Sequence, residues 1–440
     1  RATQIAARFL TATITGTYGG PTERQSGTTA AHARTSTEWH ARRGATVDLQ
    51  QRYVPESGQR STYRLTVPTD YVKTRSWPLV VGFHGWAFAH DSNPGLHAHG
   101  LSNGYIVATP SGYKDDKWPS WNGGGSTRSP GPAGPTCTMP RSGGVCYKSC
   151  GRCADACWWT TCEDSVAQIL ALLDEISTLL SVDSKMVYAV GHSNGATFLY
   201  ELAADARSAP KFAAFVAIAG LPHVGFNRPP LRPTSFLGLF GAADPFMPPT
   251  ANLSLSGGDR SVSVDPTFGS RYAVARDVST TWASAAGCDV AAAVPYTLLA
   301  APASAANRCT RWARGCHGGA EVVECVHAGG HEPPPWSVAA AWSFFRRHKA
   351  HTDCHDTPGW TNGPRPGGAL GCAEYAEKFC TGFGLAVGAA WAGGAAFNHP
   401  ERHCVVCGKK CWHPSAKQRE RRQEGGQRVS ATKAIKIQLK

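Results

Sequence analysis

The pentapeptide Gly191-His192-Ser193-Asn194-Gly195 places a serine between two glycines, a spacing that could serve nucleophilic catalysis. A serine hydroxyl attacks a carbonyl only when a base takes its proton, and the base needs an acid to orient it. Such a pentapeptide also arises easily by chance in a chain with 48 Gly among 440 residues. The hypothesis therefore depends on a strand before the first glycine, a helix after the second, and an acid and a histidine further along.

The sequence around Ser193 is typical of the local structure that this chemistry needs. Residues 186–190 form an apolar run that predicts a buried strand, and residues 196–206 contain no Pro or Gly and predict a helix. A sharp turn between such elements exposes a serine hydroxyl at the end of a sheet, and flanking glycines let the strand and the helix approach closely. We therefore interpret Ser193 as the candidate nucleophile.

An acid and a base follow two later apolar runs. Asp244 lies in the segment Gly241-Ala242-Ala243-Asp244-Pro245 that follows residues 235–240, and His331 lies in the segment that follows residues 321–326. Parallel sheets place their sites at the carboxyl ends of strands, so these two side chains are expected near the serine. Asp244 is the candidate acid and His331 the candidate base.

Weaker candidates exist for both roles. Asp244 could be a plain turn residue, in which case Asp289 or Asp265 would supply the acid. His331 could be an ordinary loop histidine and His327 the base, although His327 lies nearer to the predicted strand and is more typical of a packed residue.

Acyl transfer also needs hydrogen-bond donors for the developing oxyanion. The backbone N–H that follows the nucleophile belongs to Asn194, and a second donor is expected in the loop after the strand at 78–83. We predict that this second donor is the N–H of Trp86. The alternative for His84-Gly85 is an ordinary turn that ends a strand.

Strands and helices alternate along the part of the chain that carries these residues. Apolar runs that predict strands occupy residues 63–67, 78–83, 105–109, 186–190, 212–219, 235–240 and 321–326. Helices are predicted at residues 163–180, 196–206 and 337–348. This alternation predicts the α/β class with a doubly wound, mostly parallel sheet.

The length of the chain exceeds what a single core usually fills, so we expect one large domain with an appendage. We predict a poorly ordered N-terminal region at 1–44, a catalytic domain at 45–350 with a Cys-rich insert at 118–162, a six-cysteine module at 351–411 and a basic tail at 412–440. No run of about 18 apolar residues occurs, so no membrane-spanning segment is predicted.

Sixteen cysteines fall into three even groups along the chain. The groups span residues 137–162, 288–325 and 354–411, and even counts in each neighbourhood predict local disulfides and hence a secreted protein. Zinc is the alternative for Cys-x-x-Cys at 150–153 and 404–407, but neither group forms two paired ligand knuckles.

The insert carries Trp118, Trp121, Trp158 and Trp159, which are candidates for binding an aromatic ring or a sugar of the substrate. The alternative is that these rings pack over the disulfides of a loop with little other core.

The net charge of +13 is concentrated at the C-terminus. From Gly408 to Lys440 there are ten Lys and Arg against two Glu, a balance of 10 − 2 = +8. Such a segment is typical of a solvated, disordered tail or of contact with a polyanion such as an acidic polysaccharide. No motif of a nucleic-acid reader accompanies it, so nucleic acid is not an expected partner.

The chain resembles the secreted α/β-hydrolase esterases that include feruloyl esterases and polyhydroxybutyrate depolymerases. The resemblance rests on YRLTVP, PLVVGFHGWA, GYIVATPSG with WNGGG, CEDSVAQILALLDEI, VYAVGHSNGATFLYELAAD, AAFVAIAGLP, GAADPFMPP and HAGGHEPPPW, between about residues 60 and 350. It implies a carboxylester hydrolase that needs no metal or other cofactor, with a triad of Ser193, Asp244 and His331. His192 departs from relatives that often carry an apolar residue there, and we expect this difference not to touch the chemistry.

The family implies an ester substrate, and a feruloyl-type ester on a polysaccharide is the first expectation, with a polyhydroxyalkanoate second. The segment from Cys354 to Cys411 resembles small toxin-type six-cysteine modules appended to secreted proteins. A hydrolase scaffold recruited for polysaccharide binding or adhesion, with catalysis lost, is the competing class, and the intact Ser, Asp and His set counts against it. A peptidase on the same fold would use the same triad.

Overall fold

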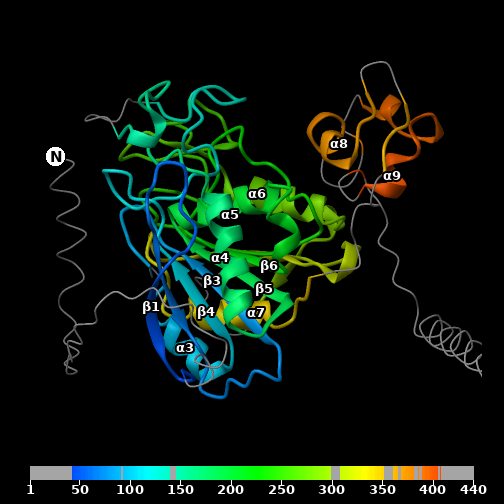
Figure 1. Cartoon of the computed structure of the whole chain (residues 1–440). Helices are drawn as coiled ribbons and strands as arrows, with labels where there is room; N and C mark the ends of the chain where they lie inside the picture. The colour runs from blue at the N-terminus through cyan, green and yellow to red at the C-terminus, as the bar shows by residue number, and fades with distance from the viewer. Residues whose placement is uncertain are drawn as a thin grey trace, which may run out of the picture.

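A computed structural model describes residues 42–90, 93–138, 145–298, 308–350, 360–364, 368–380, 385, 389–404 and 407. The predicted basic tail lies outside these residues, as does the predicted N-terminal region up to residue 41. Figure 1 shows a central sheet with helices packed against it.

The central sheet has ten strands in the order β1-β2-β4-β3-β5-β6-β7-β12-β11-β10. The six strands from β4 to β12 run parallel to one another, whereas β1 and β2 at one edge and β11 and β10 at the other add antiparallel pairings. The strands are β1 (Thr46–Gln50), β2 (Thr62–Thr66), β3 (Trp77–Phe83), β4 (Ile106–Pro110), β5 (Val182–His192), β6 (Ala214–Ile218), β7 (Ser235–Gly241), β10 (Val294–Tyr296), β11 (Arg308–Trp312) and β12 (Val322–His327). A separate antiparallel pair consists of β8 (Val262–Val264) and β9 (Arg271–Ala273).

Helices cover both faces of the sheet. One face packs against α4, α5 and α6, and the other packs against α3 and α7. The helices are α3 (Leu96–Asn103), α4 (Ser165–Leu179), α5 (Asn194–Ala204), α6 (Ala275–Ala285), α7 (Ser337–Phe345), α8 (Cys372–Lys378) and α9 (Pro400–His403). Short 3₁₀ helices are η1 (Lys148–Cys150), η2 (Ala209–Lys211), η3 (Val290–Ala292), η4 (His317–Gly319), η5 (Ala390–Ala392) and η6 (Ala395–Phe397).

Strand β3 shows why the central strands are apolar throughout. All seven of its residues are buried, and Leu79 and Val81 join the core on one face while Val80 joins the core on the other. Side chains alternate between the two faces of a strand, so a strand covered on both faces needs apolar residues at every position. This covered, mostly parallel sheet has the strand order of the α/β-hydrolase fold, and the predicted fold class is confirmed.

The seven predicted strands and three predicted helices are all present, with ends displaced by a few residues. Strands β1, β8, β9, β10 and β11 and helices α3, α6, α8 and α9 were not predicted. The missed strands are short or lie at edges where the apolar pattern is weak. Helix α3 carries a glycine and two histidines, so its sequence lacks a clear helical pattern.

Seven disulfides join fourteen described cysteines, each within one of the three predicted groups. They are Cys137–Cys157, Cys146–Cys153, Cys150–Cys162, Cys288–Cys316, Cys309–Cys325, Cys372–Cys404 and Cys380–Cys407. Local pairing is therefore confirmed for these residues. Each cysteine of the two Cys-x-x-Cys pairs forms a disulfide with a cysteine outside its own pair. These four sulfurs are therefore not free thiolates that could bind zinc.

Helices α8 and α9, orange in Figure 1, belong to a small cluster with its own core of cysteines and Tyr375. Its two described disulfides, Cys372–Cys404 and Cys380–Cys407, connect the two helices and the residues that follow them. Across the described ranges, no helix is long and apolar enough to cross a membrane.

Candidate active site

Ser193 occupies a sharp turn between the end of β5 and the start of α5. Its backbone dihedral angles are φ 54° and ψ −119°, a strained region for a residue with a side chain. The N–H of Ser193 donates a hydrogen bond to the carbonyl of Ile218 on the neighbouring strand, at 2.9 Å. This strand–turn–helix arrangement presents the serine hydroxyl at the carboxyl end of the sheet, as the sequence predicts.

The glycines on both sides of Ser193 are required by close packing. A Cβ atom on Gly191 would lie 2.5 Å from the carbonyl carbon of Gly195. A Cβ atom on Gly195 would lie 2.4 Å from the carbonyl oxygen of Phe83 on β3. Any side chain at either position would therefore collide with backbone and displace the turn.

Ser193, His331 and Asp244 form one hydrogen-bonded chain. The distance from His331 Nε2 to Ser193 Oγ is 2.8 Å, and the distance from His331 Nδ1 to Asp244 Oδ2 is also 2.8 Å. The Asp244 side chain is fully buried, whereas the His331 side chain remains 11% exposed. The three residues come from different loops, after β5, β7 and β12, and the sheet brings them together.

The surroundings of Asp244 keep its carboxylate ionised. Burial raises the pKa of Asp244, but the hydrogen bond from His331 and those from the N–H groups of Phe246 and Met247 outweigh it, so the pKa lies below its ordinary value. An ionised carboxylate accepts a hydrogen bond from the Nδ1–H of His331, which keeps the proton on Nδ1 and leaves Nε2 free to take a proton from the serine.

The other acid and base candidates have different contacts. His327 accepts a hydrogen bond from Gly329 at Nδ1, and its buried Nε2 has no partner in the described part of the chain. Asp289 pairs with Arg314, and Asp265 accepts hydrogen bonds from the backbone of its own turn. None of the three belongs to the chain of hydrogen bonds at Ser193.

The loop after β3 lies against the nucleophile. A Cβ atom on Gly85 would lie 3.3 Å from the Cβ of Ser193. Among the described residues, neither the N–H of Trp86 nor that of Asn194 donates a hydrogen bond, so both remain available for an oxyanion.

His84 fixes the shape of this loop, a role that sequence analysis missed. Its Nδ1–H donates to the carbonyl of Gly85 at 2.7 Å, and its Nε2 accepts the N–H of Gly112 at 2.8 Å. Burial lowers the pKa of His84 to about 4, so the ring stays neutral and keeps this arrangement at neutral pH. The buried ring therefore has a structural function beside the site, and His84-Gly85 is more than a turn that ends a strand.

The side chain of Asn194 ties the nucleophile turn to the Cys-rich insert. Its Oδ1 accepts the N–H of Trp121 at 2.8 Å, and its Nδ2 donates to the carbonyl of Trp121 at 3.0 Å. Asn194 is fully buried, so this pair of bonds is shielded from water. Sequence analysis assigned only the backbone of Asn194 and missed this function of the side chain.

Two of the four predicted substrate-binding tryptophans are buried, which corrects the prediction for them. Trp121 is 0% exposed and its indole donates to the carbonyl of His84, while Trp159 is 3% exposed and donates to His223. Both rings are packed as the alternative interpretation proposed and are unavailable to a ligand. Trp158 is partly exposed and donates to the carbonyl of Ser129.

Trp118 is 38% exposed and lies beside Trp86, with ring centroids 5.0 Å apart. Tyr147 holds this pair in place because its hydroxyl accepts the indole N–H of Trp86 and donates to the carbonyl of Trp118, at 3.0 and 2.9 Å. We call these two rings the Trp86–Trp118 pair. Trp86 belongs to the loop after β3, and its backbone N–H is one of the two predicted oxyanion donors.

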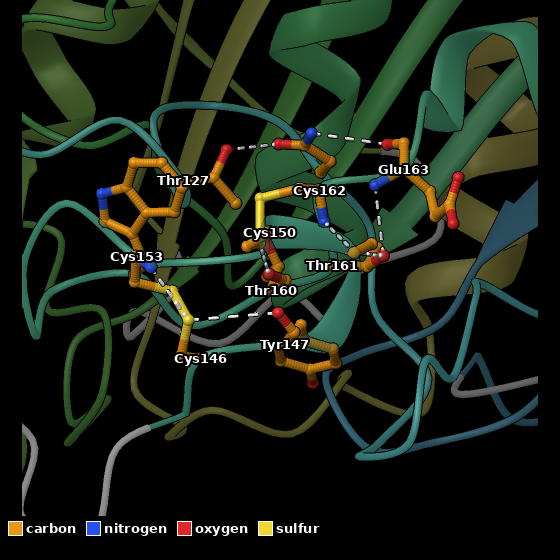
Figure 2. Close-up of a disulfide and its surroundings, with 12 residues drawn as sticks. Thr127, Cys146, Tyr147, Cys150, Cys153, Thr160, Thr161, Cys162 and Glu163 are labelled. Atoms are coloured by element: carbon orange, nitrogen blue, oxygen red, sulfur yellow. Dashed lines mark hydrogen bonds between the residues drawn. A yellow bond between two sulfur atoms is a disulfide. The ribbon is translucent and has the colours of Figure 1, made fainter. Parts of the chain in front are cut away.

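Two disulfides of the insert anchor the segment that carries Tyr147. Figure 2 shows the Cys146–Cys153 bridge and, beside it, the Cys150–Cys162 bridge, with Tyr147 directly after Cys146. The sulfur of Cys146 also accepts the N–H of Cys153. A long irregular loop can place an aromatic side chain reproducibly only when such cross-links restrict it.

Another aromatic side chain, Phe246, contacts the candidate base. The ring of Phe246 meets that of His331 edge-on at 5.1 Å, and Phe268 stacks on Phe246 at 6.2 Å. Both phenylalanines are partly exposed. Sequence analysis did not identify them because no pattern in the sequence distinguishes them from core residues.

No family model matches this chain, and no curated protein sequence matches it. Among solved structures, an acetyl xylan esterase from Aspergillus awamori is 13% identical, and the match covers 69% of this chain and 99% of that one with a TM-score of 0.42. A thermostable esterase is 17% identical, with 46% of this chain and 48% of that one covered and a TM-score of 0.30.

A fluorophosphonate-binding serine hydrolase F from Staphylococcus aureus, in a substrate-bound structure, is 12% identical, covering 46% of this chain and 80% of that one at a TM-score of 0.27. The match spans about half of the thermostable esterase and nearly all of the acetyl xylan esterase. Because these three TM-scores are below 0.5, the fold assignment rests on the order and direction of the strands themselves.

Proposed function

We propose that this protein is a serine carboxylester hydrolase with Ser193 as the nucleophile. The observation that carries the proposal is the unbroken chain of hydrogen bonds from Ser193 through His331 to Asp244, built on a strained turn that exposes the serine hydroxyl. A scaffold without chemistry has no reason to keep these three groups at bonding distance.

In the proposed mechanism, His331 takes the proton of Ser193 as the hydroxyl attacks the ester carbonyl. Asp244 orients His331 and stabilises the imidazolium that forms. The N–H groups of Trp86 and Asn194 bind the oxyanion of the tetrahedral intermediate. His331 then protonates the leaving alcohol, and a water molecule activated by the same base releases the acid from the acyl-enzyme.

A feruloyl-type ester linked to a polysaccharide is the proposed substrate. The Trp86–Trp118 pair supports this choice because it offers aromatic surface beside the oxyanion loop, where a planar phenolic ring can stack. The acetyl xylan esterase among the solved structures acts, by its name, on a substituted polysaccharide, which is compatible with this class.

A polyhydroxyalkanoate is the second candidate, and exposed apolar side chains near Ser193 favour it. Phe88 is 44% exposed, and its ring would lie 3.6 Å from a Cβ on Gly85. Trp118 is also exposed, at 38%. Exposed aromatic side chains around a site suit contact with an apolar polymer surface.

We propose that the protein works outside the cell, because its disulfides persist in oxidising compartments. We also propose the domain boundaries given above, with residues 45–350 as the catalytic domain and residues 351–411 as a six-cysteine module. Contact of the basic tail at 412–440 with a polyanion remains part of the proposal, and salt-sensitive binding to an acidic polysaccharide that disappears without the tail would test it.

A panel of substrates tests the proposed activity. Purified protein and the Ser193→Ala variant are assayed on p-nitrophenyl acetate, methyl ferulate, a polyhydroxybutyrate film and a set of peptides. Ester hydrolysis that disappears in Ser193→Ala supports the proposal. Absence of turnover would instead favour a binding protein, cleavage of peptides alone would favour a peptidase, and ester turnover that survives Ser193→Ala would overturn the mechanism.

A further inference from the structure

His192, the residue before the nucleophile, contacts the loop of the candidate base. It is 3% exposed, and its Nε2 lies 2.8 Å from the backbone carbonyl oxygen of His331. The two imidazole rings are 5.2 Å apart. His192 was expected not to touch the chemistry, but its side chain is hydrogen-bonded to the backbone of the candidate base.

The chemistry of the contact fixes the state of the His192 ring. A carbonyl oxygen only accepts hydrogen bonds, so Nε2 must carry the proton and donate it. Burial, reinforced by the neighbouring His331, lowers the pKa of His192 to about 3, so the ring is neutral. A neutral ring adds no repulsion to the imidazolium that forms on His331 during catalysis.

The His331 loop needs such a contact because its sequence offers few other anchors. His331 follows Gly329 and Gly330, which have no side chains to pack. The carbonyl of Gly329 accepts the N–H of Ala243, at 3.0 Å, which ties the loop to the acid. The bond from His192 ties the same loop to the nucleophile turn.

His192 also packs against the loop after β3. Its Nδ1 would lie 3.5 Å from a Cβ on Gly85, and it has no hydrogen-bond partner within the described ranges. One rigid ring at the end of β5 thus lies between the oxyanion loop and the base loop, and contacts both.

We infer that His192 is a positioning residue, whose Nε2–H bond to the His331 carbonyl holds the base at bonding distance from Ser193. The inference rests on the proposed function, since positioning matters only if His331 acts as a base. A displacement of about 1 Å at a reacting group can reduce a rate by about 100-fold, so the loss of one such bond is large enough to measure.

The variants separate the effect of losing the hydrogen bond that Nε2–H donates from the effect of losing the volume of the His192 ring. His192→Gln can place an amide donor near the position of Nε2, His192→Asn is too short to reach, and His192→Leu fills the space without a donor. His97→Leu is the control, because His97 is a partly buried histidine that bonds the hydroxyls of Thr66 and Thr109 away from the triad. Each variant is checked for folding by near-UV circular dichroism and thermal unfolding.

On p-nitrophenyl acetate, we expect kcat to fall about 10- to 100-fold in His192→Leu and His192→Asn with KM nearly unchanged. His192→Gln should recover most of kcat, and His97→Leu should keep the wild-type kcat. Equal kcat in folded His192→Gln and His192→Asn would overturn the inference, even if His192→Leu does not fold.

A measurement that needs no turnover separates this inference from the proposed function. The low-field proton NMR resonance of the His331–Asp244 hydrogen bond reports the position of the base whether or not an ester is a substrate. We expect it to remain sharp in wild type and His192→Gln, and to broaden or disappear in folded His192→Asn. A sharp, unshifted resonance in His192→Asn would contradict a positioning role, whatever the esterase assay shows.

Discussion

At the scale of single residues, Asp244 is the group on which the tautomer and orientation of the His331 ring depend. Its carboxylate is fully buried and accepts hydrogen bonds from His331 and from two backbone N–H groups. A buried acceptor in this position determines which nitrogen of His331 carries the proton.

We therefore predict that Asp244→Asn lowers kcat by about 10³- to 10⁴-fold while the protein stays folded, because an amide can favour the wrong imidazole tautomer. Initial rates on p-nitrophenyl acetate measure the effect. Asp289→Asn is the control, since Asp289 pairs with Arg314 and should have no effect on kcat. Similar rates for the two variants would remove Asp244 from the mechanism.

Trp118 should affect which ester is hydrolysed and leave the chemical step intact. Loss of an aromatic contact worth about 0.5–1.5 kcal/mol predicts a roughly 2- to 10-fold lower kcat/KM for methyl ferulate in Trp118→Ala. The kcat/KM for p-nitrophenyl acetate should stay within about twofold of the wild-type value, because the small acetyl group makes little contact with the ring of Trp118. An equal loss on both esters would show that Trp118 supports the site itself and does not select the substrate.

Single residues could be predicted from the sequence where the signal lies in the neighbouring residues, and not where it depends on contacts between distant parts of the chain. Ser193, Asp244 and His331 could be proposed from the sequence because each lies within a few residues of the end of an apolar run, which is a local signal. His192, His84 and Tyr147 act through contacts with residues 28 to 139 positions away, and no local pattern identifies such partners. Trp121 and Trp159 were assigned to the substrate because composition alone does not separate buried from exposed rings.

At the scale of elements, the start of α5 and the Cys-rich insert depend on each other. Trp121 N–H is buried and bonds only to the side chain of Asn194 among the described residues. This contact joins the nucleophile turn to a segment more than 70 positions earlier.

We predict that Asn194→Ala lowers the free energy of unfolding by about 1–3 kcal/mol, because it leaves the buried N–H and carbonyl of Trp121 without partners. Urea denaturation measures this change. The oxyanion donor is the backbone N–H, which alanine retains, so the folded variant should keep measurable esterase activity. An unchanged midpoint would mean that water replaces the lost bonds.

Glu321 anchors the end of α7 to the sheet through Arg347 and His348, and Arg311 on β11 bonds the same carboxylate. Burial raises the pKa of Glu321, but the hydrogen bonds from His348 and Arg347 outweigh it and bring the pKa from 4.5 to about 2. A shift of this size corresponds to on the order of 3 kcal/mol.

Because the pKa is lower in the folded state, this stabilisation is present above about pH 4.5 and is lost as the pH falls toward about 2. We predict that the free energy of unfolding of Glu321→Gln is lower than that of wild type at neutral pH. Between about pH 4.5 and about pH 2, it should decrease less than that of wild type. Urea denaturation at several pH values tests this, with exposed Glu56→Gln as the control. Parallel pH profiles for Glu321→Gln and wild type would contradict the prediction.

The strands that could be predicted from the sequence are those of the central sheet that are buried on both faces. The strands β3, β6 and β7 are almost wholly apolar, and β5 and β12 each contain a shorter stretch of mainly apolar residues, so these runs stand out from the rest of the chain. The edge strand β1 alternates between exposed and half-buried residues, and β10 has three residues. Their sequences therefore carry too little signal to separate them from loops.

At the scale of the whole molecule, the Cys-rich insert between β4 and α4 shapes the surroundings of the candidate active site at the end of the sheet. Three disulfides restrict the insert, Asn194 binds it to the nucleophile turn, and Tyr147 fixes the Trp86–Trp118 pair. The even cysteine counts predicted local pairing, but six cysteines allow 15 pairings, and only the path of the loop in three dimensions selects one.

The central claim is that Ser193 is a nucleophile activated by His331. Diethyl p-nitrophenyl phosphate phosphorylates an activated serine and leaves ordinary serines untouched, so mass spectrometry of the treated protein tests the claim directly. We predict one diethylphosphoryl group on the peptide that contains Ser193, no label in Ser193→Ala and much slower labelling in His331→Ala. Labelling of another residue, or no labelling of a folded protein that still hydrolyses esters, would contradict this account.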